Sequence, residues 1–204
     1  MENFLDLLVD GGILMIPILL CSVIALGVFL ERIFYFRRKK IIPQELLVQV
    51  EDLIKGNKIN DLTSLLKRDR SPMARIFLIA LKNFGKKRVV IKESVEEVGR
   101  QEAELLEKYV GVLSVIAQIT PLLGLLGTVQ GMIKVFNKIV SIGVGDPSQL
   151  ADGISVALVT TAAGLTVAIP TLIGHHYLMG RVNDLTSEMQ QYSIGFVDII
   201  KGED

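Results

Sequence analysis

Small and hydroxyl-bearing side chains repeat along residues 153–180, a stretch that contains no Asp, Glu, Lys or Arg. Spacings of four and three residues place them on one face of a helix. The members of this small-residue stripe are Ala157, Thr161, Gly164, Ala168, Thr171 and His175. A hydroxyl both donates and accepts hydrogen bonds, so such a face can connect water molecules along a polar path. Small residues also let membrane helices approach closely, and composition alone favours this packing interpretation.

A second uncharged stretch, residues 109–133, carries a matching edge with spacings of four, three and four. The residues of this edge are Thr120, Gly124, Gly127 and Gly131. The three glycines predict close helix packing. Thr128 lies about 100° around the helix from Gly127. Gln118 is the most polar side chain of the stretch and needs a partner within a membrane.

Three uncharged stretches divide a chain of 204 residues, half of them hydrophobic, whose formal net charge is zero. A helix of about 20 apolar residues crosses a bilayer. The pattern therefore predicts an all-α membrane protein with three transmembrane helices. A signal peptide competes for the first stretch, but the chain begins with acidic residues and lacks a small-residue cleavage site.

The predicted topology depends on Arg37-Arg38-Lys39-Lys40, which follows the first span. Clustered cations mark the cytoplasmic side of a span, so the N-terminus is expected outside and the C-terminus inside. The predicted segments are a periplasmic N-terminus (1–10), span one (11–30), a cytoplasmic helical region (31–108), span two (109–133), a periplasmic link (134–152), span three (153–180) and a cytoplasmic helix (181–204).

Two of the three membrane helices are expected to extend far into the cytoplasm. A helical pattern enters span two from about Val89, and the spacing of the small-residue stripe continues beyond span three. One helix over residues 152–200 would be roughly 70 Å long. Its outer half carries large apolar residues, which predict a packing seam in the cytoplasm. The seam residues are Val182, Leu185, Met189, Tyr192 and Phe196.

The region between the first two spans predicts short amphipathic helices over residues 41–88. It contains no phosphate-binding loop, no metal-ligand spacing and no His. We therefore expect no enzyme activity, no metal site and no cofactor. The lone Cys21 lies within an apolar run and is expected to be an inert, small hydrophobic residue.

Two segments resemble a known family. Residues 100–136 read RQEAELLEKYVGVLSVIAQITPLLGLLGTVQGMIKVF, and residues 153–170 read GISVALVTTAAGLTVAIP. Both are similar to the ExbB/TolQ family of proton channel proteins, and the chain is most like ExbB. The order of spans, basic loop and tail resembles the family along almost the whole chain.

The resemblance implies a pentamer around a central pore in the bacterial inner membrane. The pore would hold a dimer of a single-span subunit, ExbD or TolR, whose intramembrane Asp takes up and releases protons. A TonB-like or TolA-like protein would carry the work to the outer membrane. An ExbB–ExbD–TonB motor for outer-membrane import is favoured. The alternatives are a TolQ-type Tol–Pal subunit and a passive scaffold.

The resemblance also implies roles for single residues. Thr128 and Thr161 match the family's threonines in the second and third spans, and both are expected to face the partner's acid. The other residues expected along the path are Gln118, Thr120, Ala157, Gly164, Ala168 and Thr171. The alternative for each hydroxyl is a bond to its own helix four residues back. Val156 departs from a position that is often Glu in the family. His175 and His176 are expected to pack at the membrane interface, and the alternative is a role in proton exit.

Overall fold

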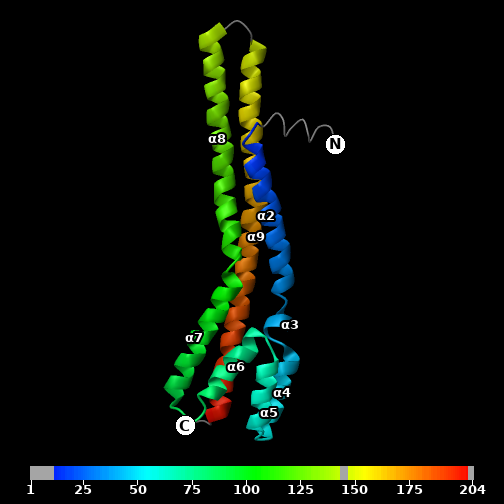
Figure 1. Cartoon of the computed structure of the whole chain (residues 1–204), viewed down its shortest axis with the longest axis vertical. Coiled ribbons are helices and arrows are strands. Elements are labelled where there is room, and N and C mark those ends of the chain that lie inside the picture. The colour runs from blue at the N-terminus through cyan, green and yellow to red at the C-terminus, as the bar shows by residue number, and fades with distance from the viewer. Residues whose placement is uncertain (1–11, 143–146, 202–204) are drawn as a thin grey trace. The chain divides into compact units, whose positions relative to one another are not determined.

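The computed structural model describes residues 12–142 and 147–201, and within them every regular element is a helix. Figure 1 shows these helices along the chain. Three stretches are long and apolar enough to cross a membrane: Met15–Tyr35, Val110–Val140 and Gly153–Ile200. The prediction of an all-helical chain with three candidate spans is confirmed. The predicted segment 1–10 lies outside the described residues.

The chain divides into two compact units, which are described separately here. The span unit comprises residues 1–30 and 109–177, and the short-helix unit comprises residues 31–108 and 178–204. Helix α9 (Pro147–Lys201) contributes its first part to the span unit and its last part to the short-helix unit, and the last residues of α2 (Met15–Tyr35) also belong to the short-helix unit.

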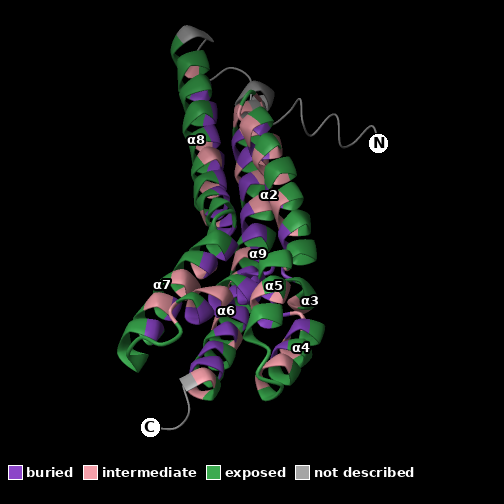
Figure 2. Cartoon of the chain, turned by 60° about the horizontal axis from the view of Figure 1, so that its bottom comes forward, coloured by how far each residue is buried: buried purple, intermediate pink, exposed green. Residues whose placement is uncertain are grey.

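The span unit is built from α2 (Met15–Tyr35), α8 (Val110–Ile142) and the first part of α9. Many large apolar side chains on these helices remain exposed, as Figure 2 shows by colour. Val23 is 70% exposed, Leu122 63% and Ile169 58%. Because an apolar outer surface suits lipid, this pattern agrees with helices that cross a membrane.

The link predicted over residues 134–152 is mostly helical in the structure. Helix α8 continues to Ile142, and α9 already begins at Pro147. No Pro or Gly interrupts the chain between Met132 and Ile142. Proline also suits the first turn of a helix, because its ring fixes φ and its missing N–H has no helical partner there.

The short-helix unit contains α3 (Arg38–Ile41), α4 (Gln44–Lys55), α5 (Ile59–Arg68), α6 (Pro72–Lys82) and α7 (Arg88–Glu107). The hydroxyl of Ser71 accepts a hydrogen bond from the N–H of Ala74 and so caps α6. The rings of Phe77 and Phe196 stack with centroids 4.2 Å apart, which packs α6 against α9. Gly85 ends the following turn with φ +90°, a conformation that favours glycine.

The helical pattern that enters the second span is divided into two helices. Helix α7 ends at Glu107 and α8 begins at Val110, with Lys108 and Tyr109 between them. Lys108 keeps helical backbone angles of φ −42° and ψ −40°. The boundary between the two units falls at the same place, after Lys108.

Candidate functional site

Helices α8 and α9 approach closely in the span unit, at points where glycine on one helix faces the other. A Cβ atom added at Gly164 would lie only 2.5 Å from the carbonyl oxygen of Thr120. One added at Gly127 would lie 2.5 Å from Cγ2 of Thr160. Any larger residue would therefore force the helices apart. The glycines of α8 that face α9 in this way are Gly124, Gly127 and Gly131.

Thr161 links the two helices by a side-chain hydrogen bond. Its hydroxyl donates to the carbonyl oxygen of Gly124, 37 residues earlier, over 2.9 Å. The alternative of a bond to its own helix therefore does not hold for Thr161. Its oxygen can still accept a hydrogen bond after donating one, so it remains able to bind water or another donor.

The other predicted hydroxyls bond to their own helices. Thr128 donates to the carbonyl of Leu125 over 2.7 Å, and Thr120 donates to Ile116 over 2.9 Å. Thr171 donates to the carbonyl of Val167 in the same manner. Thr120 is fully buried, whereas Thr128 is partly exposed. Thr128 is therefore the better placed of the three to meet a group outside the chain.

Four members of the small-residue stripe are packed inside the chain. Ala157 is 3% exposed, Ala168 5% and Thr171 9%, and Gly164 is buried against α8. In the structure these four residues pack between helices of one chain, and the pore-lining role expected for them stays a prediction. Their size permits this packing, because small side chains let backbones approach.

Gln118 lies on the exposed side of α8 and finds its partner within the same helix. Its Nε2 donates to the carbonyl of Ser114 over 3.2 Å and to the Ser114 hydroxyl over 3.1 Å. The two residues form a polar spot on an otherwise apolar helix surface. The sequence indicated that Gln118 needs a partner but did not identify Ser114.

A small cavity of about 80 Å³ lies where the start of α2 meets α8 and α9. Val156 and Thr160 line it from α9, and Gln130 and Lys134 line it from α8. The prediction from sequence missed Thr160, which is fully buried against Gly127. The pair Thr160-Thr161 was the available signal, but the stripe pattern selected only the second threonine.

Two neighbouring histidines, His175 and His176, lie near the C-terminal end of the uncharged part of α9, which ends at Gly180. The ring centroids of His175 and His176 are 5.4 Å apart in an edge-to-face arrangement. His176 is exposed, whereas Nδ1 of His175 is buried and has no hydrogen-bond partner within the described part of the chain. The sequence did not distinguish these two residues.

The predicted seam lies mostly within the core of the short-helix unit. Val182 is fully buried, and Leu185, Met189 and Phe196 are at most 4% exposed. Within the single chain Tyr192 is 36% exposed, and Ser193 is buried beside it. A strict seven-residue repeat drifts by about 20° per heptad around a straight α-helix, so the buried face moves to the next residue.

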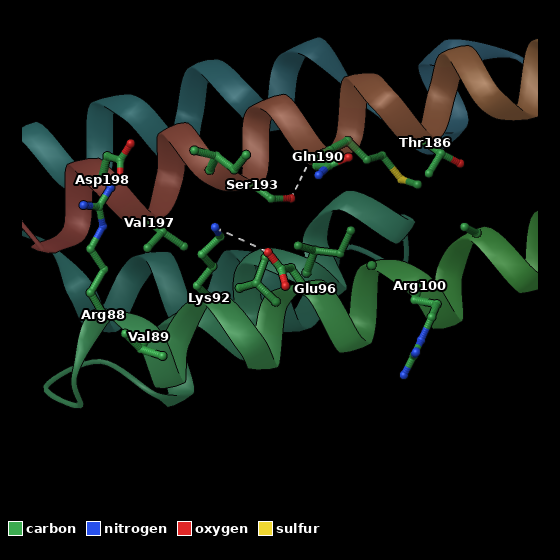
Figure 3. Close-up of a pocket in the computed structure, with 16 residues that line it drawn as sticks. Arg88, Val89, Lys92, Glu96, Arg100, Thr186, Gln190, Ser193, Val197 and Asp198 are labelled. Atoms are coloured by element: carbon green, nitrogen blue, oxygen red, sulfur yellow. Dashed lines mark hydrogen bonds and ion pairs between the residues drawn. The ribbon is translucent and has the colours of Figure 1, made fainter.

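A groove of about 630 Å³ lies between α7 and α9 in the short-helix unit. Figure 3 shows that Lys92 and Glu96 on α7 face the same space as Val197 on α9. Arg88 on α7 forms an ion pair with Asp198 on α9 at one end. The groove is thus largely apolar, with its charges paired.

Arg38 on α3 binds α9 through a bidentate ion pair with Glu188. The guanidinium Nε lies 2.9 Å from both carboxylate oxygens, and a second nitrogen also donates to the carboxylate. This hydrogen bond from Arg38 holds the pKa of Glu188 below its usual range. Glu188 lies beyond Gly180, where the uncharged part of α9 ends.

Comparison with known proteins matches residues 68–191 to a family described as the MotA/TolQ/ExbB proton channel family. The matched segment is more than half of the chain. The chain belongs to this family. One member, the "Putative biopolymer transport protein ExbB-like 3" of Synechocystis sp., is 34% identical over 166 residues, which cover 80% of this chain and 79% of the relative.

Other members of the MotA/TolQ/ExbB family carry the names of two different systems. "Biopolymer transport protein exbB1" of Vibrio cholerae is 28% identical over 98% of this chain and 89% of its own length. The "Tol-Pal system protein TolQ" of Haemophilus influenzae is 28% identical over 97% of this chain and 93% of its own. The family is therefore established, whereas the particular system is not.

The segment that matches the MotA/TolQ/ExbB family includes the candidate site. The matched segment contains Thr128, Thr161 and the glycine contacts between α8 and α9. A proton channel family whose chain carries three apolar helices is a family of multi-pass membrane proteins, not of enzymes. The site to explain is therefore a route for protons and not a catalytic centre.

Proposed function

We propose that this protein is the channel subunit of a motor that uses the proton motive force across the bacterial inner membrane. It acts with a single-span partner of the ExbD type, and a TonB-like protein delivers the work to outer-membrane import. Family membership and a relative named ExbB-like support this proposal.

One observation carries the proposal: the uncharged stretches lack an acid of their own. Residues 12–30, 110–133 and 153–177 contain no Asp, Glu, Lys or Arg. A proton route through a membrane needs a group that binds and releases protons. In our proposal an Asp on the partner's helix supplies that group, and this chain supplies the surface along which it works.

Thr161 and Thr128 are the residues that we assign to this surface. Thr161 is partly exposed and keeps acceptor capacity beside its bond to Gly124. Thr128 lies one helical position from Gly127, which packs against α9. These hydroxyls would hydrate the partner's acid without holding a charge of their own.

The orientation follows from the distribution of cations. Four consecutive cations at positions 37–40 come directly after α2, and such clusters remain on the cytoplasmic side. The short-helix unit is then cytoplasmic, and the residues between α8 and α9 are periplasmic.

Self-association completes the proposal, because one chain with three spans encloses no pore. We propose a ring of identical chains, five by resemblance to the family, around the partner's helices. The groove between α7 and α9 and the exposed Ile194 at its edge, 43% exposed, support a contact between copies there. Buried apolar area of this kind drives protein association.

A TolQ-type role in the Tol–Pal system is the second candidate. The Haemophilus relative of that name aligns with 97% of this chain. The two candidates differ in the partner and not in the proton route. Co-expression with an ExbD-type and a TolR-type subunit, followed by co-purification, separates them. A passive scaffold remains the alternative to both.

Proton flux into liposomes tests the proposed function directly. The purified chain is reconstituted with and without its single-span partner, and a pH-sensitive dye reports internal acidification under an imposed potential. Flux is expected only when both subunits are present and the partner's intramembrane Asp is intact. Equal flux with and without that Asp would leave only the scaffold role.

A further inference from the structure

Nδ1 of His175 is a buried hydrogen-bonding atom that has no partner among the residues that the structure describes. Buried side-chain nitrogens are nearly always paired, and leaving one unpaired destabilises a fold. The unpaired nitrogen therefore needs an explanation beyond packing.

The uncharged stretches contain few side chains that exchange protons. In the uncharged stretches 12–30, 110–133 and 153–177, the titratable side chains are Cys21, His175, His176 and Tyr177. Cysteine and tyrosine ordinarily stay protonated at neutral pH, whereas an imidazole gains and loses its proton there. His176 is the other imidazole, and its ring centroid is 5.4 Å away. Phe29 of α2, beside the preceding Gly174, brings no charge.

His175 also lies on the same helical face as the proposed path. Thr161 and Thr171 precede it on the small-residue stripe, and Thr171 is one helical turn away. The Thr171 hydroxyl donates to the carbonyl of Val167, so its oxygen remains free to accept. A protonated imidazole or a water molecule is a suitable donor to it.

We infer that His175 is a proton-carrying residue at the end of the path near Tyr177, and that His176 is not. This inference rests on the proposed function. A proton arriving through water binds Nδ1 and forms an imidazolium. The ring then releases one proton to water and returns to the neutral form. No other atom is transferred, and no bond to carbon changes.

The test compares the same substitution at two adjacent positions of the full complex in liposomes. His175→Asn keeps a polar atom near the Nδ1 position but cannot carry a proton. We expect it to lower proton flux by about 100-fold, the lower end of what a positioned acid–base group contributes. His176→Asn is the matched control and should stay within about twofold of the unsubstituted chain.

Two further measurements separate a proton carrier from a structural residue. Free imidazole should restore part of the flux to His175→Ala, because a small base can occupy the space of the removed ring. Nitrogen NMR of the complex in bilayers can resolve both imidazoles, since the chain has two histidines. The proton on Nδ1 of His175 should exchange with water, and the NMR signal should show this exchange. Variants that lose proton flux should also lose this exchange.

The outcomes distinguish this inference from the proposed function. Normal flux in His175→Asn, or equal loss in both Asn variants, would overturn the inference and leave the function standing if Thr161→Val still blocks flux. If neither His175→Asn nor His175→Gln assembles with the partner, His175 is structural and the inference is wrong. If the unsubstituted complex carries no protons, the proposed function itself fails.

Discussion

The Thr161 hydroxyl can be removed while the size of the side chain is kept. Thr161→Val deletes the donor to the Gly124 carbonyl and the acceptor proposed to face the partner's acid. We expect loss of proton flux, with a cost in stability of only about 1 kcal/mol for the lost hydrogen bond. Flux in liposomes and the mass of the complex in detergent measure the two effects.

Thr166 provides the matched control for this change. It is an exposed threonine of the same helix whose hydroxyl donates to the carbonyl of Ala162. Thr166→Val should therefore leave proton flux unchanged. If both variants conduct normally, Thr161 has no role in the path.

The sequence placed these threonines on one helical face but did not predict which group each hydroxyl binds. Spacing placed Thr161 and Thr171 on one face, but one bonds across to α8 and the other to its own helix. Periodicity describes a face of a single helix and does not state which neighbour covers that face. Ala157 is buried where α9 faces Gly131 of α8, a neighbour that the pattern of α9 does not contain.

Contact between α8 and α9 depends on the missing side chain of Gly164. In Gly164→Ala, the new Cβ would lie 2.5 Å from the backbone oxygen of Thr120, which cannot rotate away. The helices would have to separate, and we expect destabilisation of about 1–3 kcal/mol. Thermal unfolding of the detergent-solubilised protein measures the effect.

Gly27 of α2 is the control for this change, since a Cβ there would meet nothing within 4 Å. Alanine favours helix over glycine, so Gly27→Ala should leave the unfolding temperature unchanged or slightly raised. Equal destabilisation by both substitutions would count against close packing as the cause.

The ion pair between Arg38 and Glu188 makes the attachment of α3 to α9 sensitive to pH. Because Arg38 lowers the pKa of Glu188 in the folded state, the pair stabilises the fold above the ordinary value of 4.5. That contribution disappears as the pH falls through the lower folded pKa. The unfolding temperature of the unsubstituted protein should exceed that of Glu188→Gln at about pH 6, and the difference should shrink at about pH 3. A difference independent of pH would contradict this account.

Element boundaries show where local sequence signals end. The start of α6 at Pro72 was readable because Ser71 caps it. The sequence did not predict that α8 extends to Ile142. Lysines at 134 and 138 indicated the end of a membrane span and not the end of a helix. A helix can leave a membrane without a change in its backbone, so charge marks the membrane boundary only.

Assembly of several copies should depend on apolar residues that the single chain leaves exposed. Ile194 lines the groove between α7 and α9 and is 43% exposed. Ile194→Asp should lower the mass of the complex in detergent, because burial of an unpaired charge opposes association. Gln191→Asp, at an exposed position on the same helix, is the control. Tyr192→Asp is a poorer choice, because Tyr192 lies near Arg38. A new carboxylate at position 192 would be attracted to the Arg38 guanidinium.

The proposed orientation of the whole chain can be measured with single cysteines. In a Cys21→Ser background, a membrane-impermeant maleimide should label Lys138→Cys on cells with a permeable outer membrane. It should label Lys39→Cys only after the inner membrane is opened, because four consecutive cations keep that segment inside. Labelling of Lys39→Cys on intact inner membranes would reverse the topology.

The contacts of Gly127 and Gly131 with α9, and of Gly164 with α8, also limit how the pair can move. Each glycine receives an atom of the facing helix, so α8 cannot slide along α9 in small increments without collision. A shift to the next register would be about one helical pitch, 5.4 Å. In the proposed motor, any rotation driven by proton passage would therefore carry α8 together with the facing part of α9 in the span unit. A disulfide engineered between these two helices should leave the motor running, whereas one that fixes either helix to the partner should stop it.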